Sequence, residues 1–154
     1  GEIGKGFPLL EGAIDKGILA VGAEAVGAME VLYKSTVEYC KTREQFGQPI
    51  GKFQVLQHRM VDMFMEHEQS KSLLFMAAIK MSSGDEAEKK RSISALKVQV
   101  GKSGRFVGQN AIQLHGGMGM TDELNIGHYF KRLTAIETLF GNVDHHLKKY
   151  SNVA

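Results

Sequence analysis

Apolar residues recur at spacings of three and four along most of this chain, a pattern that predicts long amphipathic α-helices. We expect a first helix from about Pro8 to near Thr42 and a second that starts near Leu56. The segment Ser82-Ser83-Gly84-Asp85 ends the second helix, and a third runs from near Asp85 to the stop at Gly116 and Gly117. The apolar positions of the three patterns are Leu10, Ile14, Val21, Ala25, Ala28 and Leu32; Leu56, Met60, Met63, Phe64, Leu74, Ala77 and Met81; and Ile93, Leu96, Val100, Val107, Ala111 and Leu114.

Two shorter helices are predicted after the glycines, one near Leu124 to Lys131 and one from about Asn142 to Tyr150. No segment alternates apolar and polar residues as a β-strand does. The sequence therefore predicts an all-α fold, an antiparallel four-helix-bundle-like domain whose fourth element consists of shorter pieces. Small residues in the first helix favour close approach of a neighbouring helix. They are Gly22, Ala23, Ala25, Gly27 and Ala28.

Composition limits the classes of protein that this chain can belong to. With 154 residues and 43% apolar content, we expect one domain over residues 1–154, with residues 1–6 as a linker into the first helix. The 19 basic and 17 acidic residues give a net charge of +2 without long single-sign runs, which argues against a nucleic-acid surface. No apolar run is long enough to span a membrane. The single cysteine, Cys40, fits a reducing, cytoplasmic compartment. A start at Gly1 instead of methionine suggests a portion of a longer chain.

A first constellation crosses the junction between the first two helices, from Tyr39 to Gln54. An isolated Arg43 at a helix end would interact with the helix dipole or be solvated. Its surroundings favour a ligand, because a guanidinium can grip a phosphate with two hydrogen bonds and Phe46 can lie beside an apolar ring. Gly47 and Pro49 would fix the loop that presents both side chains.

A second constellation is Gln113-Leu-His-Gly116-Gly117-Met-Gly-Met-Thr121, at the end of the third helix. Glycines let a backbone approach a ligand closely, and successive peptide N–H groups can cradle phosphate oxygens. The alternative is a plain helix C-cap. The spacing matches neither the phosphate-binding loop of nucleotide hydrolases nor the dinucleotide-binding fingerprint. His115 beside this turn can touch a cofactor or serve as a surface or capping residue.

Together, the two motifs over nearly the whole chain resemble the acyl-CoA dehydrogenase family, C-terminal domain. The resemblance implies that an N-terminal helical domain and a middle β-domain are absent from this chain. It also implies that the complete protein encloses FAD and an acyl-CoA substrate and forms homo- or hetero-oligomers through the helical bundle. The cofactor contacts that it implies are Arg43, Phe46, Gln113, Gly116 and Gly117, reaching an FAD held mainly by a neighbouring subunit.

The resemblance also shows a departure from the family. The usual catalytic Glu-Gly-Thr segment falls on Phe140-Gly141-Asn142, so the glutamate that would abstract the α-proton is a phenylalanine. Some relatives carry the base at the position that matches Gly17, which has no side chain. The flavin-contacting Thr and Gln positions of the family are Asn142 and Asp144 here. We therefore assign no catalytic residue within this chain.

The implied function is part of an FAD-dependent oxidoreductase of fatty acid metabolism that performs α,β-dehydrogenation of an acyl-CoA thioester. The retained and lost positions resemble the non-base-carrying subunit of heteromeric members. A homomeric enzyme with an unusual base, Glu137 or Asp144, is the alternative for the proton. The alternative for the function is a non-catalytic subunit that stabilises a catalytic partner. In either case the isolated domain is expected to be inactive and not to retain FAD.

Two further groups of residues do not indicate a functional site. Adjacent His145 and His146 point about 100° apart on a helix, so we expect no metal site. Most methionines sit at helical spacing and are interpreted as core-filling residues, among them Met60, Met63, Met65, Met76 and Met81.

Overall fold

The computed structural model describes residues 1–82 and 84–152, and these residues form five α-helices. The helices are α1 (Phe7–Thr42), α2 (Gln54–Met81), α3 (Glu86–His115), α4 (Ile126–Thr138) and α5 (Val143–Ser151). Two short strands, β1 (Glu44–Gln45) and β2 (Gln48–Pro49), pair antiparallel between α1 and α2. Short 3-10 helices, η1 (Ile50–Lys52) and η2 (Gly116–Met120), follow β2 and α3.

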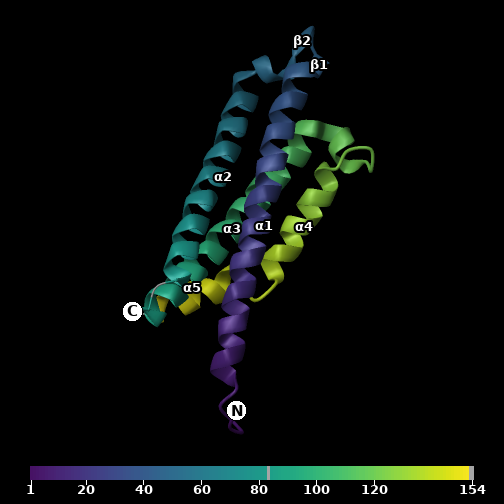
Figure 1. The fold of residues 1–154 in the computed structure, drawn as a ribbon. Coiled ribbons are helices and arrows are strands. Elements are labelled where there is room, and N and C mark those ends of the chain that lie inside the picture. Colours follow the sequence, from purple (N-terminus) through teal and green to yellow (C-terminus); the bar gives the residue numbers. More distant parts are fainter. Residues whose placement is uncertain (83, 153–154) are drawn as a thin grey trace.

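The helices form an antiparallel bundle in which α3 packs against each of the other four (Figure 1). The long helices α1, α2 and α3 lie side by side, while α4 packs on α1 and α3, and α5 packs on α3. The short helices α4 and α5 together take the place of a fourth long helix. The predicted all-α, four-helix-bundle-like fold is confirmed.

The helix ends lie where local chemistry places them. Pro8 occupies the first turn of α1, where its missing N–H costs no hydrogen bond. Asp85 caps α3, because its Oδ1 accepts hydrogen bonds from the N–H groups of Ala87 at 2.9 Å and Glu88 at 3.1 Å. Gly116 ends α3 with a φ of 60°. In the predicted stop of the second helix, Ser83 lies outside the described residues.

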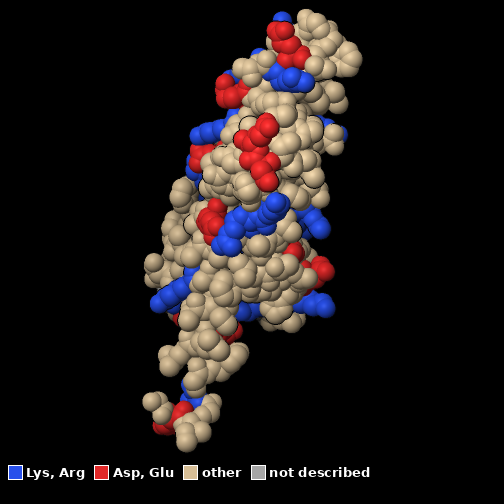
Figure 2. Space-filling model, turned by 90° about the vertical axis from the view of Figure 1, so that its right-hand side faces the viewer, with Lys and Arg blue, Asp and Glu red and all other residues tan. Residues whose placement is uncertain are grey.

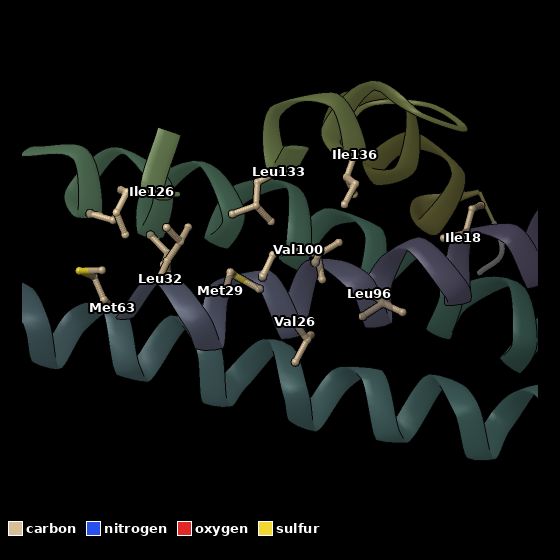
Figure 3. Close-up of a cluster of buried hydrophobic side chains, with 14 of the residues drawn as sticks. Ile18, Val26, Met29, Leu32, Met63, Leu96, Val100, Ile126, Leu133 and Ile136 are labelled. Atoms are coloured by element: carbon tan, nitrogen blue, oxygen red, sulfur yellow. The ribbon is translucent and has the colours of Figure 1, made fainter. Parts of the chain in front are cut away.

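The core lies between α1, α3 and α4, with a smaller contribution from α2 (Figure 3). All six apolar positions predicted for the third helix are buried. From α1 the core receives Ile18, Met29 and Leu32, each almost fully buried. Burial of each such side chain stabilises the fold by about 1.5–3 kcal/mol.

Glycines allow three close contacts along α1 and α3. A Cβ added at Gly22 would lie 2.9 Å from Leu96 Cδ2, so α1 and α3 approach closely only because position 22 has no side chain. On α3, Gly101 and Gly108 similarly accommodate side chains from α5 and α4, and an added Cβ would lie 2.7 Å from each. The close approach predicted from the small residues of the first helix is confirmed at Gly22.

Two residues of the apolar faces predicted for the helices are exposed. Leu10 is 56% exposed because the first turns of α1 project beyond the bundle (Figure 1). Phe64 is 46% exposed because it follows the buried Met63, and adjacent helical residues point in different directions. The methionines are also mixed, since Met63 is buried while Met65 is exposed on the same helix. The interpretation of the methionines as core-filling residues is therefore wrong for some of them.

The prediction was also incomplete in two segments. The hairpin of β1 and β2 was missed because two-residue strands are too short to show alternation. The helix predicted near residues 124–131 runs instead from Ile126 to Thr138, because the buried Leu133 and Ile136 continue its apolar face.

Figure 2 shows acidic and basic side chains interspersed over one face of the molecule. Such mixing agrees with the nearly balanced charge of the sequence. Within the described part of the chain, no helix is both long and apolar enough to cross a membrane.

Candidate functional site

The junction between α1 and α2 is a tight hairpin with Arg43 at its base. Arg43 leaves helical geometry with a ψ of 119° directly after α1. The chain then folds back, because the N–H of Ile50 donates to the Arg43 carbonyl at 2.8 Å. Phe46 and Gly47 form the turn with positive φ angles of 55° and 78°. The hairpin thus fixes the backbone from which the Arg43 side chain extends.

The glycine turn lies next to this junction. Tyr39 of α1 joins the two, because its ring stacks on His115 with centroids 4.4 Å apart and its hydroxyl donates to the His115 carbonyl at 3.4 Å. A Cβ added at Gly117 would meet nothing within 4 Å, so the backbone there is open to a ligand. Tyr39 therefore sets the position of the turn relative to Arg43.

Four of the predicted site residues line one hollow of about 410 Å³. These residues are Arg43, Gln113, Gly116 and Gly117, and Tyr39, Gln45, Ile50, Leu114, His115 and Met118 complete the lining. All four are exposed. Among residues 1–82 and 84–152, the Arg43 guanidinium has neither a hydrogen-bond acceptor nor an ion-pair partner. A free cation beside an open glycine backbone can bind a phosphate-bearing cofactor.

Phe46 does not line this hollow. Its side chain is 91% exposed at the tip of the hairpin. The ring contacts Phe53 edge to face, with centroids 6.1 Å apart. Phe46 is therefore close to Arg43 in sequence but does not share the cavity that Arg43 lines with Gln113, Gly116 and Gly117.

His115 is buried, so its interpretation as a surface residue is wrong. Burial lowers the pKa of His115, while its hydrogen bond to a backbone carbonyl opposes that effect. Nδ1 lies 2.8 Å from the carbonyl oxygen of Ala111, which can only accept, so Nδ1 carries the proton. The helical spacing of His115 from the buried Ala111 was the signal in the sequence. The buried ring serves as the surface on which Tyr39 stacks.

At the opposite end of the bundle, Gly17 of α1 faces Phe140, which lies between α4 and α5. A Cβ added at Gly17 would lie 3.0 Å from Phe140 Cζ. Phe140 has a φ of 59°, which is uncommon for a bulky residue and indicates local strain. The two positions at which a base was expected from the resemblance are therefore in contact, and neither carries a carboxylate.

A second hollow, of about 460 Å³, adjoins this contact. Its lining combines apolar with charged side chains: Phe7, Glu11, Ile14, Ile18, Phe140, Gly141, His145, His146 and Lys149. Glu11 pairs with Lys90 at 3.0 Å and with Lys149 at 3.5 Å. The hydrogen bond with Lys90 lowers the pKa of Glu11. The carboxylate among these lining residues is thus already engaged with cations.

Two buried polar side chains hold the segment that carries Phe140. Lys97 of α3 donates from Nζ to the carbonyls of Glu137 at 2.8 Å and Gly141 at 2.7 Å. The imidazole of His146 lies with Nε2 3.0 Å from the Phe140 carbonyl. Burial lowers the pKa of Lys97 and lowers the pKa of His146 to about 4. Sequence reasoning missed Lys97, although its place between the buried Leu96 and Val100 was a signal.

The polar residues after Phe140 serve the start of α5. The Asn142 side chain accepts the His145 N–H at 3.0 Å, which makes it the N-cap. Glu137 Oε1 accepts the Val143 N–H at 3.3 Å. Asp144 is exposed in the first turn of the helix. Each alternative base therefore stands at a helix terminus, where a structural role accounts for it.

The paired histidines differ in their surroundings. His146 is buried, whereas His145 is exposed, and their rings meet nearly perpendicular at 5.1 Å between centroids. Across the described residues, no group of three or more histidine, cysteine or acidic side chains is arranged to hold a metal ion.

Comparisons with known proteins indicate the family to which this fold belongs. A family model described as "Acyl-CoA dehydrogenase, C-terminal domain" matches residues 4–151. A short-chain specific acyl-CoA dehydrogenase from Megasphaera elsdenii is 34% identical over 85% of this chain and 34% of its own length.

Solved structures show the same fold. The three-dimensional structure of butyryl-CoA dehydrogenase from Megasphaera elsdenii has a TM-score of 0.92 at 29% identity, over 99% of this chain and 39% of that one. A structure of PigA with FAD and proline has a TM-score of 0.84 at 27% identity, over 90% of this chain and 36% of that one. The chain spans about a third of the length of the curated relatives that it matches.

Proposed function

Because this chain belongs to the acyl-CoA dehydrogenase family and corresponds to its C-terminal domain, we propose that it is part of a flavin-dependent enzyme acting on acyl-CoA thioesters. In the complete assembly, the domain contributes contacts to FAD across a subunit interface. The observation that carries this proposal is the hollow in which an unpaired Arg43 faces the open backbone of Gly116 and Gly117.

The residues of this hollow fit a dinucleotide. A guanidinium can donate two hydrogen bonds to a diphosphate, and the Gln113 amide can donate to a hydroxyl or a ring nitrogen. Gly117 leaves room for close backbone approach, because nothing lies within 4 Å of where its Cβ would be. The exposed Phe46 at the hairpin tip is free to lie against a ring that a second subunit brings to it.

FAD, when bound, supplies the acceptor for the hydride that leaves the β-carbon of the thioester. Removal of the α-proton in the same reaction needs a carboxylate within reach. The Phe140 ring fills the space over Gly17, so this chain offers no base at either position. We propose that the proton goes to a residue of another subunit, in a heteromeric assembly in which this chain completes the cofactor site.

A non-catalytic role is the second candidate. The contact between Phe140 and Gly17 favours it equally, because a subunit that only stabilises a catalytic partner needs no base.

A fatty acyl substrate and a cytoplasmic location are part of the proposal, the latter because Cys40 is a buried free thiol.

The test uses the full-length protein, purified alone and with its genomic neighbours, and titrates FAD by absorbance. Arg43→Ala should weaken FAD binding about 10- to 100-fold, as expected for the loss of a charge-assisted hydrogen bond. Arg105→Ala is the matched control, because Arg105 is exposed on α3 and does not line the hollow.

Equal FAD affinity in the two variants would reject the cofactor contact. Loss of flavin from a co-purifying partner chain on Arg43→Ala would show that the site is shared between subunits. Bleaching of the flavin by acyl-CoA only when the partner is present would support a base in that partner.

A further inference from the structure

The segment from Glu137 to Gly141 is contacted by a buried cation, the ammonium of Lys97. Lys97 is fully buried, and its Nζ contacts the carbonyls at both ends of the segment, on Glu137 and Gly141. Within residues 1–82 and 84–152, Lys97 forms no ion pair with a carboxylate. A buried ammonium is costly, and an apolar side chain of similar volume would avoid that cost. What Lys97 adds is therefore the pair of carbonyl contacts.

A buried imidazole holds the middle of the same segment. A carbonyl oxygen only accepts, so the 3.0 Å contact with Phe140 requires that His146 Nε2 carries the proton. Burial lowers the pKa of His146 to about 4, which favours the neutral ring at neutral pH. Its Nδ1 lies 3.5 Å from Ser94 Oγ on α3. Lys97 and His146 together hold three backbone carbonyls of a five-residue segment.

These anchors are needed because the segment itself is weakly bonded and strained. The Gly141 N–H donates to the Thr138 carbonyl at a long 3.4 Å. Phe140 and Gly141 both have positive φ angles, 59° and 103°, and the former is unfavourable for a phenylalanine. A bulky residue keeps such a conformation only when its surroundings impose it.

We infer that Lys97 and His146 are positioning residues, which lock the backbone at residue 140 so that its side chain is pressed against Gly17. The inference depends on the proposed function in one respect, the assignment of position 140 as the usual position of the base. The lock explains why the Phe140 ring stays so close to Gly17 that an added Cβ there would lie 3.0 Å from Cζ. Because its backbone is fixed, Phe140 forms a rigid part of the lining of the adjoining hollow.

The test measures hydrogen exchange by mass spectrometry in a peptide covering residues 138–142 of the full-length protein. Lys97→Met should speed exchange there at least tenfold, while exchange in α2 remains unchanged. Lys102→Met is the control, because Lys102 lies on the exposed face of the same helix. This readout needs neither FAD nor substrate, so its failure is distinguishable from failure of the proposed function.

A double-mutant cycle separates positioning from simple packing. In Gly17→Ala the new Cβ presses on the Phe140 ring, so exchange in the segment should rise several-fold while the lock is intact. In the Lys97→Met background the segment can retreat, and Gly17→Ala should change exchange less than twofold. Independent, multiplicative effects of the two substitutions would overturn the inference, as would unchanged exchange in Lys97→Met.

If Lys97→Met also speeds exchange throughout α2, His146→Leu decides the matter. It removes the contacts of the imidazole with Phe140 and Ser94 while Lys97 stays in place, and it should speed exchange in residues 138–142 but not in α2. Absence of that local effect would overturn the role of His146 and with it the lock.

Discussion

The Phe140 ring lies directly on the backbone of Gly17, where a Cβ would be only 3.0 Å from its Cζ. These two residues are 123 positions apart in the chain, on α1 and in the connection between α4 and α5. The resemblance implies that relatives carry their base at one or the other of these two positions. Their contact means that a side chain at one position fills the space of the other.

A carboxylate placed at position 140 should restore a base to this chain. Because Lys97 and His146 fix the backbone there, Phe140→Glu should direct its carboxylate along the path that the ring now takes. In the full-length protein without its partner, anaerobic flavin bleaching by a short-chain acyl-CoA should become at least ten times faster. Leu139→Glu is the control, since residue 139 precedes the strained position. Equal rates in both variants would contradict a specific role for position 140.

Gly22 and Gly27 should respond oppositely to alanine. An added Cβ at Gly22 would lie 2.9 Å from Leu96, so Gly22→Ala should destabilise the fold by about 1–3 kcal/mol through overpacking. At the exposed Gly27 nothing lies within 4 Å, and Gly27→Ala should stabilise by about 0.5–1 kcal/mol through helix propensity. Urea unfolding of the 154-residue chain checks both. A stabilised Gly22→Ala variant would refute close packing of α1 on α3.

His146 should make stability depend on pH. Burial lowers its pKa to about 4 in the folded state, against 6.5 for an unperturbed histidine. The unfolded chain therefore binds a proton more readily between these values. The stabilisation from neutral His146 is fully present above about pH 6.5 and is lost as the pH falls toward 4, by about 3 kcal/mol.

The measurement for His146 compares urea unfolding at several pH values with that of His146→Gln. Glutamine can still donate to the Phe140 carbonyl but does not titrate in this range. The difference between the two proteins should grow with pH from 4 to 6.5 in favour of the natural chain. His145→Gln, at the exposed neighbour, should show no such difference. A constant difference would place the folded pKa near its ordinary value.

Alanine substitutions at Gly116 and Gly117 should have different effects, the first on the stability of the fold and the second on FAD binding. Gly116 has a φ of 60°, so Gly116→Ala should destabilise the fold by about 1–3 kcal/mol. Gly117→Ala meets no neighbour and should leave the unfolding transition unchanged, while it weakens FAD binding to the full-length protein. Parallel unfolding and FAD titrations test the pair. Unaltered FAD affinity in Gly117→Ala would remove that residue from the proposed site.

Much of the fold was predictable because helix formation depends on local patterns. Pro8, Asp85 and Gly116 mark helix ends through their own backbone chemistry, and the buried face of α3 follows its spacing. The hairpin was not predictable, since strands of two residues have no period. Nor was the exposure of Phe64, because the number of neighbours around a helix is a property of the bundle.

The candidate site, like the fold, was only partly predictable from the sequence. The sequence by itself determined which groups are present: a guanidinium and glycines for a cofactor, and no carboxylate at positions 17 and 140. Only the tertiary structure decided that Arg43 and Gly117 share a hollow while Phe46 stays outside it. It alone also brought Gly17 to Phe140 and placed Lys97 against the carbonyl of Gly141. Chemistry belongs to each residue, whereas distance between remote residues depends on how the helices pack.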